Sequence, residues 1–187
     1  MATFGEGLKT SIEVVAYLAT IGAIAFAVQQ YRATEADNRV NATLSYVGRF
    51  NSDPALQSFK RLDDAWYSNA EQGESHDPTK SQIQFIENNN LKWDAILLGD
   101  FFDQLYVCVN RDICDQNLAI TMLGRDIETV YVLTGRYLTS LTYTGCGLKA
   151  LYEVAHPRLK FSRLKPEEQQ GKPRPNPALR PDACPTI

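Results

Sequence analysis

Residues 91–109 read LKWDAILLGDFFDQLYVCV, and this stretch predicts the central helix of the fold. Apolar side chains recur in it every three or four residues, the spacing that places them on one face of an α-helix. Further apolar residues widen that face, which is typical of a helix that packs against several neighbours. The predicted face consists of Trp93, Ile96, Leu97, Phe101, Leu105 and Val109, widened by Phe102, Tyr106 and Val107.

The segments on either side share this helical period. They predict helices over residues 33–50, about 54–69 and about 115–142, and a helix that begins near Ser81 and is interrupted around 88–90 before the central one. No segment alternates apolar and polar residues between hairpin turns. The predicted fold class is therefore all-α, with an antiparallel bundle of about four helices over residues 32–142. The inward positions are Val40, Leu44, Val47, Phe50, Leu56, Phe59, Leu62, Trp66, Tyr67, Leu118, Met122, Ile127, Val130, Tyr131, Leu138 and Leu141.

The C-terminal part of the chain changes character. Seven of the nine prolines lie between His156 and Pro185. We expect a short helix and linker over residues 143–162, with the helix at 148–156, and a proline-rich, basic, disordered tail over 163–187. Such a tail suits a protein partner or an acidic lipid surface.

An uncharged apolar run, VVAYLATIGAIAFAV, occupies residues 14–28. Extended to residues 11–31 it has the roughly 20-residue length that crosses a bilayer core of about 30 Å as a helix. The sequence therefore predicts a short N-terminal tail (residues 1–10) and a transmembrane anchor (residues 11–31) that continues into the bundle. A cleaved signal peptide is the alternative, because Ala25-Phe26-Ala27 fits a small-x-small cleavage site. Glu6 and Glu13 beside a single Lys9 argue against it.

The flanking charges bear on the orientation of this anchor. Arg32, Arg39 and Arg49 follow the span, and this bias predicts a single-pass protein of the inner membrane with a cytoplasmic C-terminal domain. Small residues also line one face of the span: Ala19, Gly22, Ala23 and Ala27. This small-xxx-small spacing permits close packing of two anchors, so a homodimer is an alternative to a face that meets only lipid.

The overall charge argues against nucleic-acid binding. The chain carries 19 basic and 22 acidic residues, for a formal net charge of −3. The basic surface that binds nucleic acid is therefore missing. The charge is uneven, because residues from Lys149 onward include eight basic and four acidic residues. No motif indicates a cofactor or a phosphate-binding loop, and we predict none.

Three aspartates are the candidates for chemistry. Asp100 and Asp103 lie three residues apart, where both project from one side of a helix, and Asp94 lies further back. Paired carboxylates share a proton or hold a divalent cation. A di-iron bundle would need Glu-x-x-His repeats, which the predicted bundle helices lack. A solvated acidic face explains the three residues more simply.

The four cysteines are Cys108, Cys114, Cys146 and Cys184. Cys108 and Cys114 flank the turn after the central helix, and they could be bridged in an exported protein or serve as a thiol pair. The chain has no CxxC pair and is too long for a disulfide scaffold. We therefore expect reduced, partly buried thiols.

The order of these features resembles a known family. The apolar span ends in Gln29-Gln30-Tyr31-Arg32 and is followed by GRFNSDP at residues 48–54, DFFDQ at 100–104 and NRDI at 110–113. With a long helix that carries Tyr131, this pattern resembles the bacterial family catalogued as domain of unknown function 4760, over roughly residues 12–141. The resemblance implies a single-pass anchor with a helical domain and implies no activity. The proline-rich tail departs from it.

These observations predict an interaction, scaffold or sensing module anchored in a membrane, and favour a protein that is not an enzyme. Two alternatives stay open. One is an exported helical protein with a cleaved signal peptide. The other is a membrane-bound enzyme or metal binder that uses Asp94, Asp100 and Asp103.

Overall fold

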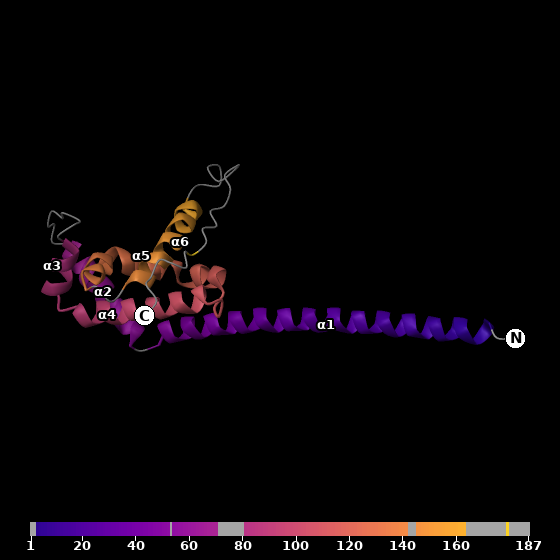
Figure 1. The fold of residues 1–187 in the computed structure, drawn as a ribbon. Coiled ribbons are helices and arrows are strands. Elements are labelled where there is room, and N and C mark those ends of the chain that lie inside the picture. The colour runs from indigo at the N-terminus through magenta and orange to yellow at the C-terminus, as the bar shows by residue number, and fades with distance from the viewer. Residues whose placement is uncertain (1–2, 53, 71–80, 142–144, 164–178, 180–187) are drawn as a thin grey trace. The chain divides into compact units, whose positions relative to one another are not determined.

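The computed structural model describes residues 3–52, 54–70, 81–141, 145–163 and 179, without the side chains of residues 3–18, 69–70, 81 and 161–162. The described residues form helices and no strand, which confirms the predicted all-α class. They divide into two compact units, residues 1–38 and 39–187. The helices are α1 (Thr3–Phe50), α2 (Ala55–Ala70), α3 (Ser81–Asn88), α4 (Lys92–Asn110), α5 (Gln116–Ser140) and α6 (Cys146–Ser162) (Figure 1).

The first unit contains most of α1. Its backbone is helical from Thr3, so most of the tail predicted over residues 1–10 is part of the helix. Within the described part of the chain, no helix combines the length and the apolar character that a membrane crossing needs. The transmembrane helix predicted over residues 11–31 therefore gains no support from the structure, and its first eight side chains lie outside the described residues. Ala19, Gly22, Ala23 and Ala27 are all exposed.

The second unit is built around α4, as the sequence predicted. One side of α4 buries Leu98, Phe102 and Leu105 completely. Helix α6 packs against both α4 and α5, while α2 packs on α4 and α3 on α5. Phe50, at the end of α1, completes the core with rings of Phe59, Phe101 and Phe102 around it at centroid distances of 5.5–5.7 Å.

The buried face of α4 is rotated relative to the prediction. Trp93 was expected inside but is 80% exposed, and Val107 is also exposed. Two residues turn the helix this way. Asp94 is buried, and Gly99 lies so close to Leu138 that an added Cβ would be 3.0 Å from its Cδ1. Neither aspartate nor glycine contributes to a pattern of apolar residues. The sequence therefore could not indicate that Asp94 and Gly99 lie on the buried face of α4.

The end of α1 also differs from the prediction. Val47 and Phe50 are buried, but Val40 and Leu44 are exposed. Thr43 is the fully buried residue of this turn. Its hydroxyl donates a hydrogen bond to the Arg39 carbonyl at 2.8 Å and accepts one from the Asp115 backbone N–H at 2.8 Å. The polar side chain of Thr43 thus makes the contact with the start of α5, where the apolar pattern had predicted that Val40 and Leu44 would be buried. On the other helices, Tyr67 and Met122 were expected inside and are exposed.

Both ends of the long helix α5 are fixed by side chains. Asp115 is its N-cap, and the carboxylate accepts a hydrogen bond from the Leu118 N–H at 2.8 Å. Near the other end, the Gln82 amide donates to the Val132 carbonyl and accepts from the Arg136 N–H at 3.0 Å. An α-helix would join these two backbone groups directly, so Gln82 attaches α3 to α5 through the hydrogen-bond ladder of α5.

Helix α6 is longer than predicted. It begins at Cys146 and continues through Pro157 to Ser162. A proline inside a helix removes one backbone hydrogen bond. Val154 and Ala155 before it are buried, and Leu159 after it packs on the core, which keeps the helix in place. Most of the tail predicted to be disordered lies outside the described residues, but Leu179 is described and packs half-buried against the core.

Candidate functional site

The three candidate aspartates all lie on α4 but have different environments. Asp94 is only 4% exposed, and its Oδ1 lies 2.6 Å from Nη2 of Arg61 on α2. This ion pair links the first turn of α4 to α2. Asp94 therefore has a structural partner of its own and does not face the other two aspartates as a ligand would.

Asp103 caps helix α6 from the side. Its Oδ2 accepts a hydrogen bond from the Gly145 N–H at 2.7 Å, and its Oδ1 accepts one from the Leu148 N–H at 3.0 Å. The first N–H groups of a helix have no partner inside the helix and carry a partial positive charge. The Asp103 carboxylate on α4 satisfies one of them, the Leu148 N–H, together with the N–H of Gly145, the residue just before the helix. Gly147 lies against this carboxylate, where an added Cβ would be 2.8 Å from Oδ1.

Asp100 is exposed and forms no hydrogen bond or ion pair with another described residue. Burial raises the pKa of its carboxyl group, and the negative charge of Asp103 raises it further. The charged form is thus disfavoured and uncompensated. A cation beside Asp100 would remove that cost.

The aspartates do not converge on a metal site. Across the described residues, no group of three or more His, Cys, Asp or Glu side chains is placed to hold a metal ion. Asp94 and Asp103 already accept from an arginine and from backbone N–H groups. The arrangement fits structural roles for these two and leaves Asp100 facing solvent.

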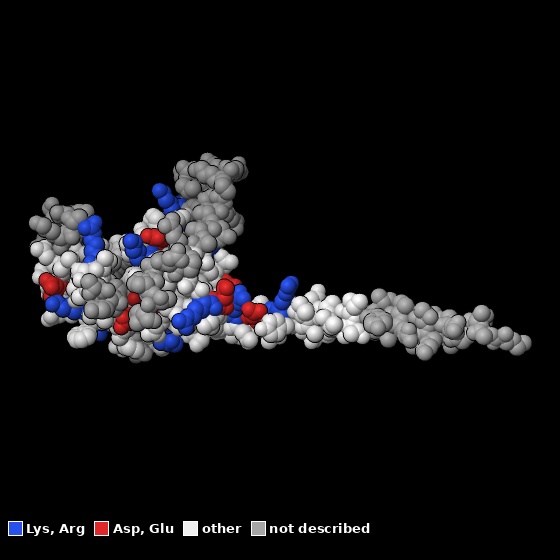
Figure 2. Space-filling model, in the orientation of Figure 1, with Lys and Arg blue, Asp and Glu red and all other residues white. Residues whose placement is uncertain are grey.

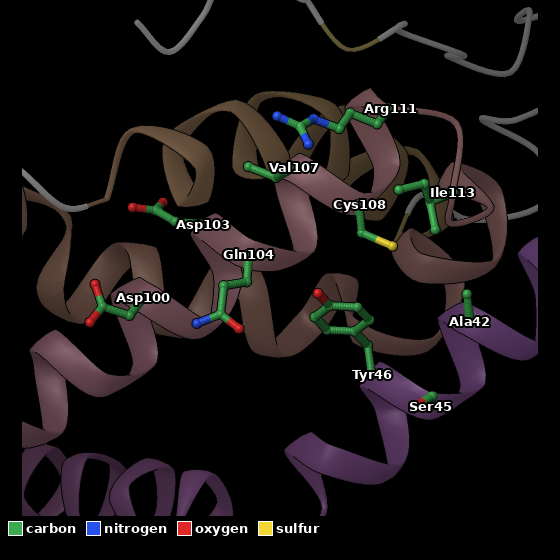
Figure 3. Close-up of a pocket in the computed structure, with 10 residues that line it drawn as sticks. All are labelled: Ala42, Ser45, Tyr46, Asp100, Asp103, Gln104, Val107, Cys108, Arg111 and Ile113. Atoms are coloured by element: carbon green, nitrogen blue, oxygen red, sulfur yellow. The ribbon is translucent and has the colours of Figure 1, made fainter. Parts of the chain in front are cut away.

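A groove runs along the exposed face of α4. One hollow, of about 570 Å³, lies between α4 and the end of α1 and includes Tyr46, Gln104 and Val107. Figure 3 shows Tyr46 reaching from α1 toward α4 in this hollow. A second hollow, of about 530 Å³, includes Trp93, Ile96 and Leu97. Asp100 and Gln104 line both, so the two hollows adjoin; we call them together the α4 groove.

The groove combines an apolar end with fixed polar groups. Trp93 and its neighbours Ile96 and Leu97 supply the apolar lining. Arg49 is held in place, because its Nη2 donates to Oε1 of Gln104 at 3.3 Å and its guanidinium lies 5.1 Å from the centre of the Tyr46 ring. On the face shown in Figure 2, acidic and basic side chains are interspersed. An open, mostly apolar groove of this kind suits a peptide segment better than a small substrate.

The cysteines differ from the expectation of reduced thiols. Cys108 and Cys114 form a disulfide with their Cα atoms 5.2 Å apart. Cys146 is disulfide-bonded as well, and no described cysteine is free. The turn explains the first bond. Asp112 has a positive φ of 56°, and the N–H groups of Ile113 and Cys114 both bond to the Cys108 carbonyl, which returns the chain to the end of α4.

One ionisable cluster was missed from the sequence. Glu128 on α5 accepts from His156 Nδ1 at 3.0 Å and from Arg163 Nη2 at 2.5 Å. His156 also lies beside Tyr152, which stacks on Tyr131 with ring centres 4.1 Å apart. Neither hollow of the α4 groove includes these residues. Glu128 and His156 are 28 residues apart on different helices, and no short motif could have linked them.

Comparison with protein-family models, curated proteins and solved structures finds no match for the chain. The resemblance to the family of domain of unknown function 4760 stays a prediction.

Proposed function

We propose that this protein is a membrane-anchored interaction module whose helical domain binds a protein segment in the α4 groove. The observation that carries the proposal is the exposure of Trp93, an aromatic side chain that lies in a groove with Ile96 and Leu97. Tryptophan in a pocket is a common anchor of protein interfaces. Asp100 lies beside it without a partner among the described residues. The expected segment pairs an apolar side chain with a basic one.

The anchor in this proposal is the apolar run of residues 11–31. Its support is the uncharged stretch from Val14 to Val28, whose Val, Leu, Ile and Phe residues favour insertion by about 2–4 kcal/mol in total on an insertion scale. A homodimer through Ala19, Gly22, Ala23 and Ala27 remains part of the proposal. An Ala23→Leu substitution would then reduce crosslinking between differently tagged copies, and unchanged crosslinking would argue against it.

The orientation of the domain needs a second consideration. The arginines after the run favour a cytoplasmic domain, but disulfides persist in oxidising compartments and are rare in the cytosol. The Cys108–Cys114 bond therefore favours a domain on the oxidising side of the membrane. Both a reversed anchor and a cleaved signal peptide satisfy this. The intact mass of the protein from carbonate-washed membranes distinguishes them, because cleavage after Ala27 would leave a shorter, soluble chain.

The test of the groove is site-specific photocrosslinking in cells. A benzophenone amino acid replaces Trp93 in the full chain, and a matched control carries it at Val132, which is exposed on α5. We expect one protein to be captured from position 93 and not from position 132. An added Asp100→Lys substitution should abolish the capture. Equal capture from both positions, or capture unaffected by Asp100→Lys, would contradict the proposal.

A metal-binding function has less support. It would need Asp94, Asp100 and Asp103 to share an ion, whereas two of them are bonded elsewhere. A metal-binding function would be indicated if divalent cations raised the Tm of the wild type and did not raise the Tm of Asp100→Asn.

A further inference from the structure

We propose that the Cys108–Cys114 disulfide is a thiol-exchange site that a reductant reaches through the hollow between α4 and the end of α1, and that its reduction loosens the contact of α1 with the turn between α4 and α5. The proposal goes beyond the binding of a protein segment, because it needs no occupant in the α4 groove. It rests on two observations. Cys108 lines the hollow, and the turn that the disulfide closes contacts α1.

The two cysteines of this bond differ in their access to solvent. Cys108 is 6% exposed and lines the hollow together with Val107 and Ile113 (Figure 3). Cys114 is 2% exposed, and neither hollow of the α4 groove includes it. In thiol–disulfide exchange a thiolate must reach one sulfur of the bond, and the rate depends on access to that sulfur. The hollow therefore directs the attack to Sγ of Cys108.

The charges that line the hollow favour a thiolate at this end. Arg111 lies three residues after Cys108, and a positive group nearby stabilises the thiolate form of a sulfur. The two acidic residues of the lining are Asp100 and Asp103. The Asp103 carboxylate accepts hydrogen bonds from backbone N–H groups around the start of α6, and Asp100 lies where the two hollows adjoin. Eight residues of helix separate Asp100 from Cys108, a rise of about 12 Å.

The exchange takes place in two steps. A thiolate of a dithiol oxidoreductase attacks Sγ of Cys108, forms a mixed disulfide and releases Cys114 as a thiolate, which takes up a proton. The second thiol of the oxidoreductase loses its proton and attacks the oxidoreductase sulfur of the mixed disulfide, which releases Cys108 as a thiolate that is protonated in turn. The protein disulfide thus gains two electrons and two protons, and the dithiol is oxidised to a disulfide.

The turn that the disulfide closes makes two contacts with α1. The Asp115 N–H donates to Oγ1 of Thr43 at 2.8 Å, and Oδ1 of Asp112 lies 3.8 Å from Nη1 of Arg39. Asp112 has a positive φ of 56°, a left-handed conformation that is costly for a residue other than glycine. After reduction, backbone hydrogen bonds within the turn must hold this conformation without the covalent bond. The turn therefore opens more readily, and both contacts with α1 weaken.

The first test identifies the attacked sulfur in the full, oxidised chain. The protein is mixed with reduced glutathione, quenched with a maleimide and digested with trypsin, which places Cys108 in the peptide 93–111 and Cys114 in the peptide 112–125. We expect to find glutathione on Cys108 about ten times as often as on Cys114, because the rate of exchange follows access. Equal amounts on the two cysteines, or more on Cys114, would overturn the proposal.

A substitution that fills the hollow tests the route of the reductant. Val107 is an exposed valine of α4 that lines the hollow, and Val132 is a matched exposed valine on α5. We expect Val107→Trp to slow the reduction of Cys108–Cys114 by glutathione about tenfold, and Val132→Trp to leave the rate within about twofold of the wild type. If both variants are reduced at the wild-type rate, the reductant does not enter through the hollow.

The effect on α1 is measured by limited trypsin digestion of the Cys108→Ser/Cys114→Ser variant without reductant. Cleavage after Arg39 should be about fivefold faster than in the wild type, because local opening exposes this bond. Arg61 is the matched control, since it also pairs with an aspartate, Asp94, but away from the turn. Unchanged cleavage after Arg39, or an equal increase at both arginines, would contradict the proposal. None of these measurements uses photocrosslinking at position 93, so this proposal and the proposed function fail separately.

Discussion

Asp100 and Asp103 are separated by one turn of the same helix, but their surroundings give them different effects on stability. Asp103 accepts two backbone hydrogen bonds from the start of α6, whereas Asp100 carries a charge that burial and its neighbour disfavour. We expect Asp103→Ala to lower the free energy of unfolding by about 1–3 kcal/mol, since it leaves two N–H groups without partners. Asp100→Ala should stay within about 0.5 kcal/mol of the wild type. Urea denaturation measures both, and equal losses would contradict the assigned roles.

Asp126 gives a pH-dependent test at the same scale. Burial raises the pKa of its carboxyl group, and Arg125 only partly offsets this. The folded state thus holds the proton more tightly than the unfolded state does. This contribution to stability is complete below the unfolded pKa and is lost as the pH rises through the folded pKa. Asp126→Asn should therefore raise Tm near pH 7 and have little effect near pH 3. Thermal melts at the two pH values test this, with Asp64→Asn on the exposed surface of α2 as the control. An equal shift at both pH values would exclude a titration effect.

At the scale of elements, the junction of α4 with α6 depends on a glycine. A Cβ on Gly147 would lie 2.8 Å from Oδ1 of Asp103 and 2.9 Å from its Cα, and the backbone atom cannot move aside cheaply. Gly147→Ala should therefore cost about 1–3 kcal/mol, as overpacked sites do. Gly48→Ala is the matched control, because nothing lies within 4 Å of its added Cβ and alanine favours a helix more than glycine does. If Gly147→Ala left the free energy of unfolding unchanged in denaturant melts, α4 and α6 would be able to move apart at little cost.

Helix positions could be predicted from the sequence better than helix faces could. Periodicity located α2, the break near residue 90 and the start of α5, because capping residues and polar clusters interrupt the apolar pattern there. Periodicity did not predict which face of α4 is buried, because that face includes Asp94 and Gly99. It also did not predict that Thr43 is buried. These residues reveal their roles only through partners on other helices. The end of α6 was missed because Pro157 is read as a stop when no packing partner is known.

The candidate site was predicted less well, for the same reason. The three aspartates are visible as a pattern, but whether they act together depends on Arg61 and on the N–H groups of α6, which lie far away in sequence. The residues that line the groove around Trp93 were predicted to lie in the hydrophobic core. The family resemblance could not help, since it implies no activity for any residue.

At the scale of the molecule, the disulfides make the stability of the fold depend on whether its surroundings are oxidising or reducing. Replacing both Cys108 and Cys114 with serine opens a ring that joins the end of α4 to the start of α5. On the loop-entropy relation this should cost about 2 kcal/mol. Denaturant melts of the double variant measure the loss. Wild-type protein in a strong reductant should lose at least as much. A double variant as stable as the oxidised wild type would show that the turn holds itself closed.

The hydroxyl of Thr43 has a consequence for observing the molecule in solution. The amides at the start of a helix normally exchange their hydrogens quickly, because no turn precedes them. The Asp115 amide instead donates across to Thr43 on α1. Its exchange with deuterium is therefore slow only while the last turns of α1 stay seated on the start of α5. A single amide signal would thus report whether the end of the long helix is attached to the domain, in detergent, in a bilayer or with a partner bound.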